Sequence, residues 1–184
     1  MEKALDQAVD LFWAKGYEGT SLTDLTDAIG VNKPSLYAAF GGKEQLFFKA
    51  LDRYQERLKS YTAQSLTLPS GRSSVEAFLH ALATFQSAPE TPKGCLLVQG
   101  ALAASDESRQ VTQTLCELRE SGVEMIRRHL ERAYDQGELP LDTDLDALAR
   151  YFITVSQGIS VQAANGVATE ELHKTIAIAM RGWP

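Results

Sequence analysis

Apolar residues recur every three or four positions along most of this chain, which is the spacing of one face of an α-helix. The first such run contains Leu5, Ala8, Val9 and Phe12, and Gly16 follows at a position where a helix can end. No stretch shows the alternation that is typical of a β-strand, and no internal repeat is present. The pattern therefore predicts an all-α fold of about nine helices.

Residues 20–43 carry the signals of two short helices joined by a tight turn. Ser21 followed by Asp24 predicts a capping box at the start of the first helix, and Gly30 supplies the turn. Asn32 caps the second helix, and Pro34 falls in its first turn, where a missing N–H group is harmless. Two helices in this arrangement form a helix-turn-helix, which places its second helix in the major groove of DNA.

The second of these helices is predicted to have a buried face and an exposed face. Leu36 and Phe40 share the inner face at helical spacing. The side chains that point away from it are short or flat enough to approach a duplex closely, and they belong to Pro34, Ser35, Tyr37 and Ala38.

Lys33 and Lys43 each stand at the start of a helix, where unpaired N–H groups and the helix dipole attract anions. A lysine there destabilises an isolated helix by about 0.3–1 kcal/mol, and a phosphate bound beside it would reverse that sign. These lysines favour contact with a DNA backbone, although exposed lysines on helical hairpins are also common in proteins that bind no DNA.

The charge of the chain is unevenly distributed. The formal net charge is −6, of which residues 1–30 carry −4, residues 31–60 carry +3 and the remaining residues carry −5. The basic segment coincides with the second helix of the predicted helix-turn-helix. A local basic patch of this kind matters more for nucleic-acid binding than the total charge does.

Several other classes of protein are not indicated. No run of about 18 apolar residues predicts a membrane span, and no secretion signal opens the sequence. Cys95 and Cys116 make no disulfide framework and fit a reducing cytoplasm, so we expect a cytoplasmic protein. The histidines His80, His129 and His173 lack partners at metal-ligand spacing, and no nucleophile and base converge. We expect no metal, no cofactor and no catalytic residue.

Residues 5–51 resemble the N-terminal domain of the tetracycline-repressor (TetR) family of bacterial transcription regulators, through the motifs "KGYEGTS", "SLYAAF" and "GGKEQLF". The resemblance implies a DNA-binding domain over residues 1–45 and a ligand-binding and dimerisation domain over residues 46–184. It implies base contacts from Lys33, Pro34 and Ser35, and phosphate contacts from Thr20, Ser21, Thr23, Tyr37 and Lys43. In an alternative interpretation, the ring of Tyr37 packs against the first helix.

One feature departs from the family pattern. Many members carry a basic arm before the first helix, whereas this sequence opens with "MEKALDQ", which is acidic on balance and already helical in its periodicity. Either the arm is absent or the sequence begins after it. If it is absent, we expect a lower affinity for DNA.

The C-terminal two-thirds is predicted to enclose a small-molecule pocket. Residues 95–104, "CLLVQGALAA", are apolar on almost every side and predict a buried helix between the helices over residues 73–88, 106–136 and 144–165. A buried apolar space with a few polar groups is typical of a ligand pocket. The candidate ligand-binding residues are Phe78, Leu82, Phe85, Gln99, Met125, His129, Phe152 and Ser156.

Cys95 admits two interpretations. A thiolate there would suit a redox or electrophile sensor, but nothing basic adjoins it in the sequence to lower its pKa. The role of a small buried residue is therefore favoured.

The last two helices, over residues 144–165 and 169–182, carry two apolar stripes on the first and one on the second. We expect this surplus to form a homodimer interface of four helices about a two-fold axis. The prediction is a dimeric repressor that binds a palindromic DNA operator and is released by a small-molecule effector, with no membrane partner. Two alternatives remain: an enzyme on a helical bundle, and a helical ligand carrier or adaptor that binds no DNA.

Overall fold

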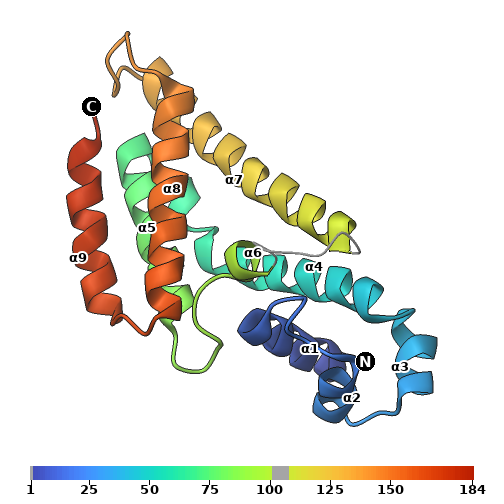
Figure 1. Ribbon diagram of the computed structural model, residues 1–184. Helices are drawn as coiled ribbons and strands as arrows, with labels where there is room; N and C mark the ends of the chain where they lie inside the picture. The colour runs from blue at the N-terminus through green and yellow to red at the C-terminus, as the bar shows by residue number, and fades with distance from the viewer. Residues whose placement is uncertain (1, 101–107) are drawn as a thin grey trace.

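The computed structural model describes residues 2–100 and 108–184, and over these residues the chain is helical with no strand, which confirms the all-α prediction. Figure 1 shows the elements, which number nine α-helices and two short 3₁₀ helices in the described ranges. The α-helices are α1 (Glu2–Lys15), α2 (Leu22–Ile29), α3 (Lys33–Phe40), α4 (Lys43–Thr62), α5 (Gly71–Ser87), α6 (Leu96–Gln99), α7 (Arg109–Asp135), α8 (Leu145–Ala164) and α9 (Thr169–Ala179). The 3₁₀ helices are η1 (Ser65–Thr67) and η3 (Met180–Gly182).

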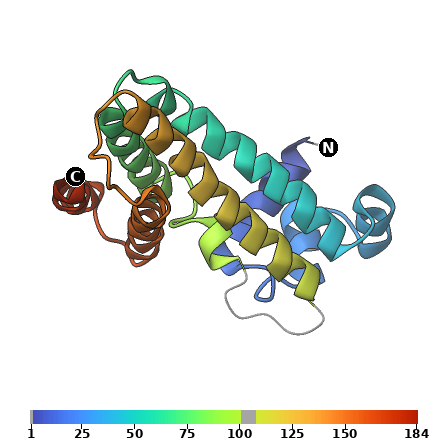
Figure 2. The ribbon, with the colours of Figure 1, turned by 90° about the horizontal axis from the view of Figure 1, so that it is seen from above.

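The helices form two groups that share α4. Helices α1, α2 and α3 gather at one end, α5, α8 and α9 pack at the other, and α3 and α9 lie at opposite ends in both views (Figures 1 and 2). The first hydrophobic core contains Phe12, Leu36 and Phe47 from the N-terminal helices, and it also takes in Phe85 and Leu96 from the C-terminal part. The two groups are therefore joined by packed side chains as well as by α4.

The predicted signals of the helix-turn-helix are confirmed. Ser21 Oγ accepts a hydrogen bond from the Asp24 amide at 3.0 Å, and the Asp24 carboxylate accepts one from the Ser21 amide at 2.8 Å. Gly30 ends α2 with φ of 77°, a left-handed conformation that glycine adopts without strain. Asn32 Oδ1 accepts from the Ser35 amide at 2.9 Å and so starts α3.

The starts of two later helices differ from the prediction by one to two residues. Helix α5 is capped by Ser70, whose hydroxyl accepts from the Ser73 amide, so Ser73 lies inside the first turn. Helix α8 is capped by Asp144, whose carboxylate accepts from the Ala147 amide at 3.0 Å, so α8 begins at Leu145. In both cases several capping residues adjoin in the sequence, and periodicity does not decide between neighbours.

The buried helix predicted over residues 95–104 is helical over Leu96–Gln99. Leu96 and Val98 are buried there, as the all-round apolar pattern predicts. The remainder of that prediction, from residue 101 on, lies outside the described residues.

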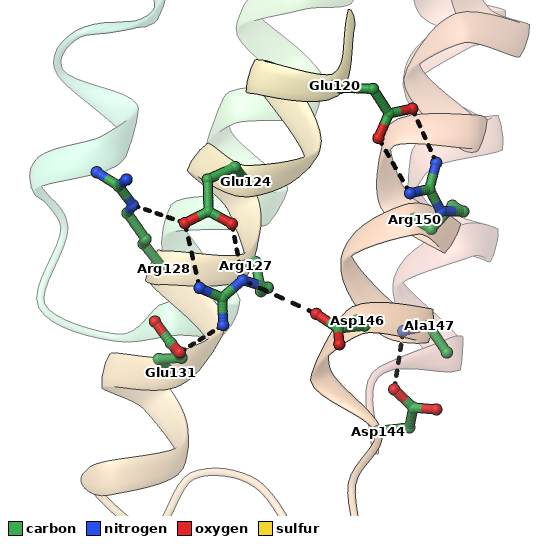
Figure 3. Close-up of polar contacts among 9 residues, drawn as sticks. All are labelled: Glu120, Glu124, Arg127, Arg128, Glu131, Asp144, Asp146, Ala147 and Arg150. Carbon is green, nitrogen blue, oxygen red and sulfur yellow. Dashed lines mark hydrogen bonds and ion pairs between the residues drawn. The ribbon is translucent and has the colours of Figure 1, made fainter.

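Ion pairs hold α7 against α8 on the outside of the molecule (Figure 3). Arg150 donates to both carboxylate oxygens of Glu120 at 3.1 Å each. Arg127 Nε lies 3.8 Å from Asp146 Oδ1. Hydrogen bonds, first of all from Arg127, lower the pKa of Glu124 to about 2. Because these groups are largely exposed, salt weakens the network, and the buried side chains between the two helices carry most of their association.

Part of each apolar stripe of α8 is used within the chain itself. Phe152 and Ile159 of one stripe and Ala149 and Ile153 of the other are buried within the chain's own core, against α5, α7 and α9. Large apolar side chains that remain exposed on α8 and α9 are Tyr151, Val161 and Ile178.

A second ion-pair cluster fastens α1 to α4. Asp6 accepts hydrogen bonds from Arg53 at 3.0 Å and from Arg57 at 2.7 Å, and Arg57 also donates to Asp10 at 2.8 Å. The hydrogen bonds from Arg53 and then Arg57 lower the pKa of Asp6 below its usual value. The cluster links the first helix of the N-terminal group to the helix that runs into the C-terminal part.

We expect an Asp6→Asn variant to lose about 1 kcal/mol of the free energy of unfolding at pH 7. A carboxylate whose folded pKa is depressed stabilises the fold above its unfolded pKa, about 3.9, and that stabilisation is lost as the pH falls through the folded value. The difference between wild type and variant should therefore shrink below about pH 4. Urea unfolding between pH 3 and 7 measures it, with the exposed Asp52→Asn as a control that should show no such difference. A difference that persists at pH 3 would contradict the ion-pair origin.

Candidate DNA interface and ligand cavity

The outer face of α3 is free of the protein's own core. Leu36 and Phe40 are buried against the neighbouring helices, at 0% and 6% exposure. The predicted base-contacting residues Lys33, Pro34 and Ser35 are all exposed. The structure thus brings together, on one turn at the start of α3, the residues that the sequence assigned to base recognition.

A second cation stands beside this face at the start of α4. The Nζ atom of Lys43 lies over the ring of Tyr17, 4.1 Å from the ring centroid. The Lys43 side chain is partly buried, and this burial lowers the pKa of Lys43. Tyr37 is half exposed, and its ring lies beside Gly42. This position differs from the alternative interpretation, in which the Tyr37 ring packs on the first helix. The turn at Gly41 and Gly42 has φ of 84° and 131°, so glycines bring α4 close behind α3.

The predicted phosphate contacts before α2 are divided. Ser21 and Thr23 are exposed at the start of that helix. Thr20 is buried at 0% exposure, and its hydroxyl donates to the Gly16 carbonyl at 2.7 Å. The Thr20 side chain therefore stabilises the turn after α1 and does not face outward, which corrects its place among the DNA-contacting side chains.

The C-terminal part encloses a cavity of about 600 Å³. Its walls come from α4, α5, α7, α8 and the α6 segment, and they are mainly apolar, with Leu58, Leu66 and Ile153 among them. A space of this size and character is typical of a site for a small apolar ligand. The described residues contain no group of three or more His, Cys, Asp or Glu side chains placed to hold a metal ion.

Four of the eight predicted ligand-binding residues line this cavity, namely Phe78, Leu82, Met125 and Ser156. The other four do not, and each has another environment. Phe85 stacks on Trp13, and Phe152 packs beside Trp183. Gln99 lies against Gly94 near α1, and His129 contacts Arg132 on the same helix.

The second half of α4 is the wall that the sequence did not indicate. Gln55, Leu58, Lys59 and Thr62 line the cavity, along with Gln86 of α5 and Arg119 of α7. The periodicity of α4 predicts which of its residues are buried but not whether they meet a neighbour or a void. Residues 55–62, "QERLKSYT", are mainly polar and gave no separate signal for a pocket.

Cys95 also lines the cavity and is buried as a thiol. The Tyr54 hydroxyl donates to its Sγ at 3.2 Å, and Cys95 is 5% exposed. Burial raises the pKa of Cys95, so the thiolate that a redox sensor requires is disfavoured. This environment agrees with the favoured interpretation, that of a small buried residue.

The segment from Gly94 to Gly100 lies between the cavity and the N-terminal helices. Residues 95, 97 and 98 line the cavity, while the Gly94 carbonyl accepts from Trp13 Nε1 at 3.0 Å. At the other end of the segment, the Gly100 carbonyl accepts from the Tyr17 amide at 3.0 Å. Hydrogen bonds therefore connect this segment of the cavity wall to α1 and to Tyr17, whose ring lies beneath Lys43.

The sequence comparisons agree with this architecture over its whole length. Residues 4–50 match the family described as bacterial regulatory proteins of the tetR family, and residues 71–181 match the tetracyclin repressor-like C-terminal domain. The chain is 33% identical to the HTH-type transcriptional repressor ComR of Escherichia coli over 185 residues, which cover 100% of this chain and 88% of ComR. The chain belongs to the tetR family. The HTH-type transcriptional repressor BdcR of Escherichia coli is a further relative, 30% identical over 97% of this chain and 86% of its own.

Solved structures of the tetR family place the same fold on DNA. A cysteine mutant of the TetR family transcriptional regulator CifR, complexed with 26 bp double-strand operator DNA, is 39% identical and has a TM-score of 0.96. The alignment covers 100% of this chain and 96% of the CifR chain. A TetR regulator from Chloroflexus aurantiacus is 25% identical with a TM-score of 0.86, covering 98% of this chain and 91% of its own.

No helix of the described residues is both long and apolar enough to span a membrane.

Proposed function

We propose that this protein is a transcriptional repressor that binds a palindromic operator as a homodimer and is released by a small apolar effector. Residues 1–45 form its DNA-binding domain, and residues 46–184 hold the effector and the dimer contact. The observation that carries the proposal is the exposed outer face of α3, with Lys33 at its start and Lys43 beside it. Operator binding by the similar CifR supports the assignment.

The dimer is assigned to α8 and α9. Tyr151, Val161 and Ile178 expose apolar surface on these helices, and both lie at the end of the molecule opposite to α3 (Figures 1 and 2). A two-fold axis through this face presents two copies of α3 to one duplex. Two recognition helices of this kind read half-sites about 34–36 Å apart, one turn of DNA.

Helix α4 provides the link between effector and operator. Its first residue, Lys43, belongs to the DNA face, and Gln55, Leu58, Lys59 and Thr62 toward its other end line the cavity. A helix of 20 residues is a rod of about 30 Å, so a small tilt at the cavity becomes a displacement at α3. Effector binding releases DNA if the effector prefers the tilted arrangement, because a ligand shifts an equilibrium only by its differential affinity.

Selection of bound duplexes from a random pool tests the proposal. We expect enrichment of an inverted repeat whose half-sites lie one helical turn apart. A Ser35→Ala variant should enrich a different base at one position of each half-site, since one direct base contact contributes about 1–3 kcal/mol of discrimination. Ser73→Ala, at an exposed serine of α5, serves as the control and should enrich the wild-type repeat. Recovery of unrelated sequences, or of the same repeat by wild type and Ser35→Ala alike, would contradict the assigned reading face.

A further inference from the structure

One buried polar group of the cavity lacks a hydrogen-bond partner. Gln86, in the last turn of α5, is 3% exposed and lines the cavity. Within the described part of the chain, its side-chain carbonyl Oε1 accepts no hydrogen bond. Burying such an acceptor without a partner costs about 1–3 kcal/mol, and most buried polar groups in folded proteins are paired.

The backbone around Gln86 is held in place. Its main-chain carbonyl accepts from the Gly94 amide at 2.8 Å, which brings α5 next to the segment that carries Cys95. Cys95 lines the same cavity, and its Sγ already accepts from the Tyr54 hydroxyl. Gln86 therefore lies on the cavity wall where α5 meets the segment that carries Cys95.

The charges on the cavity wall restrict the molecule further. Lys59 and Arg119 line the cavity. Neither forms an ion pair with a carboxylate among the described residues. The described lining residues include no Asp or Glu. A cationic ligand would meet only like charge there. An acceptor-only group such as a carboxylate cannot pair with Gln86 Oε1, so the group that pairs with this atom carries a proton.

We propose that Gln86 is the specificity-determining residue of the cavity and that the effector is an apolar molecule without a cationic group, whose hydroxyl or amide N–H donates to Gln86 Oε1. This inference rests on the proposed function for its regulatory meaning and names the ligand class of that site. The apolar body of the ligand contacts Leu58, Phe78 and Leu82, and its donor pairs the orphaned carbonyl. A hydrogen bond inside an apolar pocket discriminates strongly because its absence leaves the protein group unpaired.

The test compares two probes with the same chain and different heads, 1-octanol and octyl methyl ether, by calorimetry on the full chain. The alcohol can donate to Gln86, and the ether only accepts. We expect wild type to bind the alcohol about tenfold more tightly than the ether. In Gln86→Met, an unbranched apolar side chain of similar length, the two probes should bind equally. Gln157→Met changes another glutamine of the same cavity wall and should keep the preference for the alcohol.

The outcomes separate this inference from the proposed function. If wild type shows no preference, if Gln86→Met retains it, or if neither probe binds, the role of Gln86 is rejected. Operator release is measured in parallel on a duplex obtained by selection. A Gln86-dependent preference for the alcohol without release from the duplex would leave the ligand class intact and overturn the coupling to DNA. Operator binding by a protein that shows no Gln86-dependent preference would leave the repressor intact and overturn this inference.

Discussion

A Lys43→Ala variant is expected to lose about two to four orders of magnitude in affinity for its operator, with a salt dependence that is shallower by about two. Lys43 stands at the first turn of α4, held over the ring of Tyr17. A charged hydrogen bond to a phosphate contributes about 1.5–3 kcal/mol, and a dimer on a palindrome loses two of them. Each phosphate contact also contributes about 0.9 to the slope of log affinity against log salt. Fluorescence anisotropy of a labelled operator at several salt concentrations measures both quantities.

The matched control for this variant is Lys59→Ala. Lys59 is exposed on the same helix, at the end of α4 that is far from α3. Its substitution by alanine changes the net charge by the same amount as Lys43→Ala does. We expect its affinity and salt slope to stay close to those of wild type. An equal effect of the two variants would assign the loss to net charge, and an unchanged slope in Lys43→Ala would reject its phosphate contact. A ligand carrier that binds no DNA would show no salt-dependent duplex binding at all.

The DNA face could be predicted because its signals are local. The capping box of Ser21 and Asp24, the cap at Asn32 and the left-handed turn at Gly30 each depend on residues within three or four positions of one another. Such short-range hydrogen bonds form in the same way in almost any context. Once the helix boundaries were set, the inner position of Leu36 fixed the direction of every other side chain on α3.

The cavity could be predicted only in part because it depends on contacts between distant helices. Periodicity showed that Phe85 and Phe152 face inward, but not that they meet Trp13 and Trp183 instead of the void. For Gln86, the sequence did not indicate burial. A glutamine near the end of an amphipathic helix is usually solvated, and only the approach of the segment at Gly94 buries it.

The dimer stays a prediction for the same reason. Two apolar stripes on α8 favoured a second subunit as partner, and within the chain α8 already packs against α5, α7 and α9. The exposed apolar surface that is available to a second subunit includes Val161 of α8 and Ile178 of α9. Counting apolar positions does not reveal how many neighbours a helix has.

The largest stability effect is expected for Trp13→Ala, at about 3–5 kcal/mol of the free energy of unfolding. Trp13 is 1% exposed and belongs to α1, yet its ring packs on Tyr54 of α4 and Phe85 of α5. Its removal opens a cavity where the two groups of helices meet and also deletes the hydrogen bond to Gly94. Because natural domains are stable by about 5–15 kcal/mol, this loss is a large fraction of the total. Urea unfolding followed by circular dichroism measures it.

Trp183, the second tryptophan of the chain, provides the control for Trp13. It is partly exposed near the C-terminus and packs on Phe152, so Trp183→Ala should cost clearly less. Trp13→Phe keeps a six-membered aromatic ring but removes the rest of the indole with its donor to the Gly94 carbonyl. Leaving that carbonyl buried and unpaired should cost about 1–3 kcal/mol in addition to the lost packing. We therefore expect the cost to fall in the order Trp13→Ala, Trp13→Phe, Trp183→Ala. An equal cost for Trp13→Ala and Trp183→Ala would contradict the central packing role assigned to Trp13 at this junction.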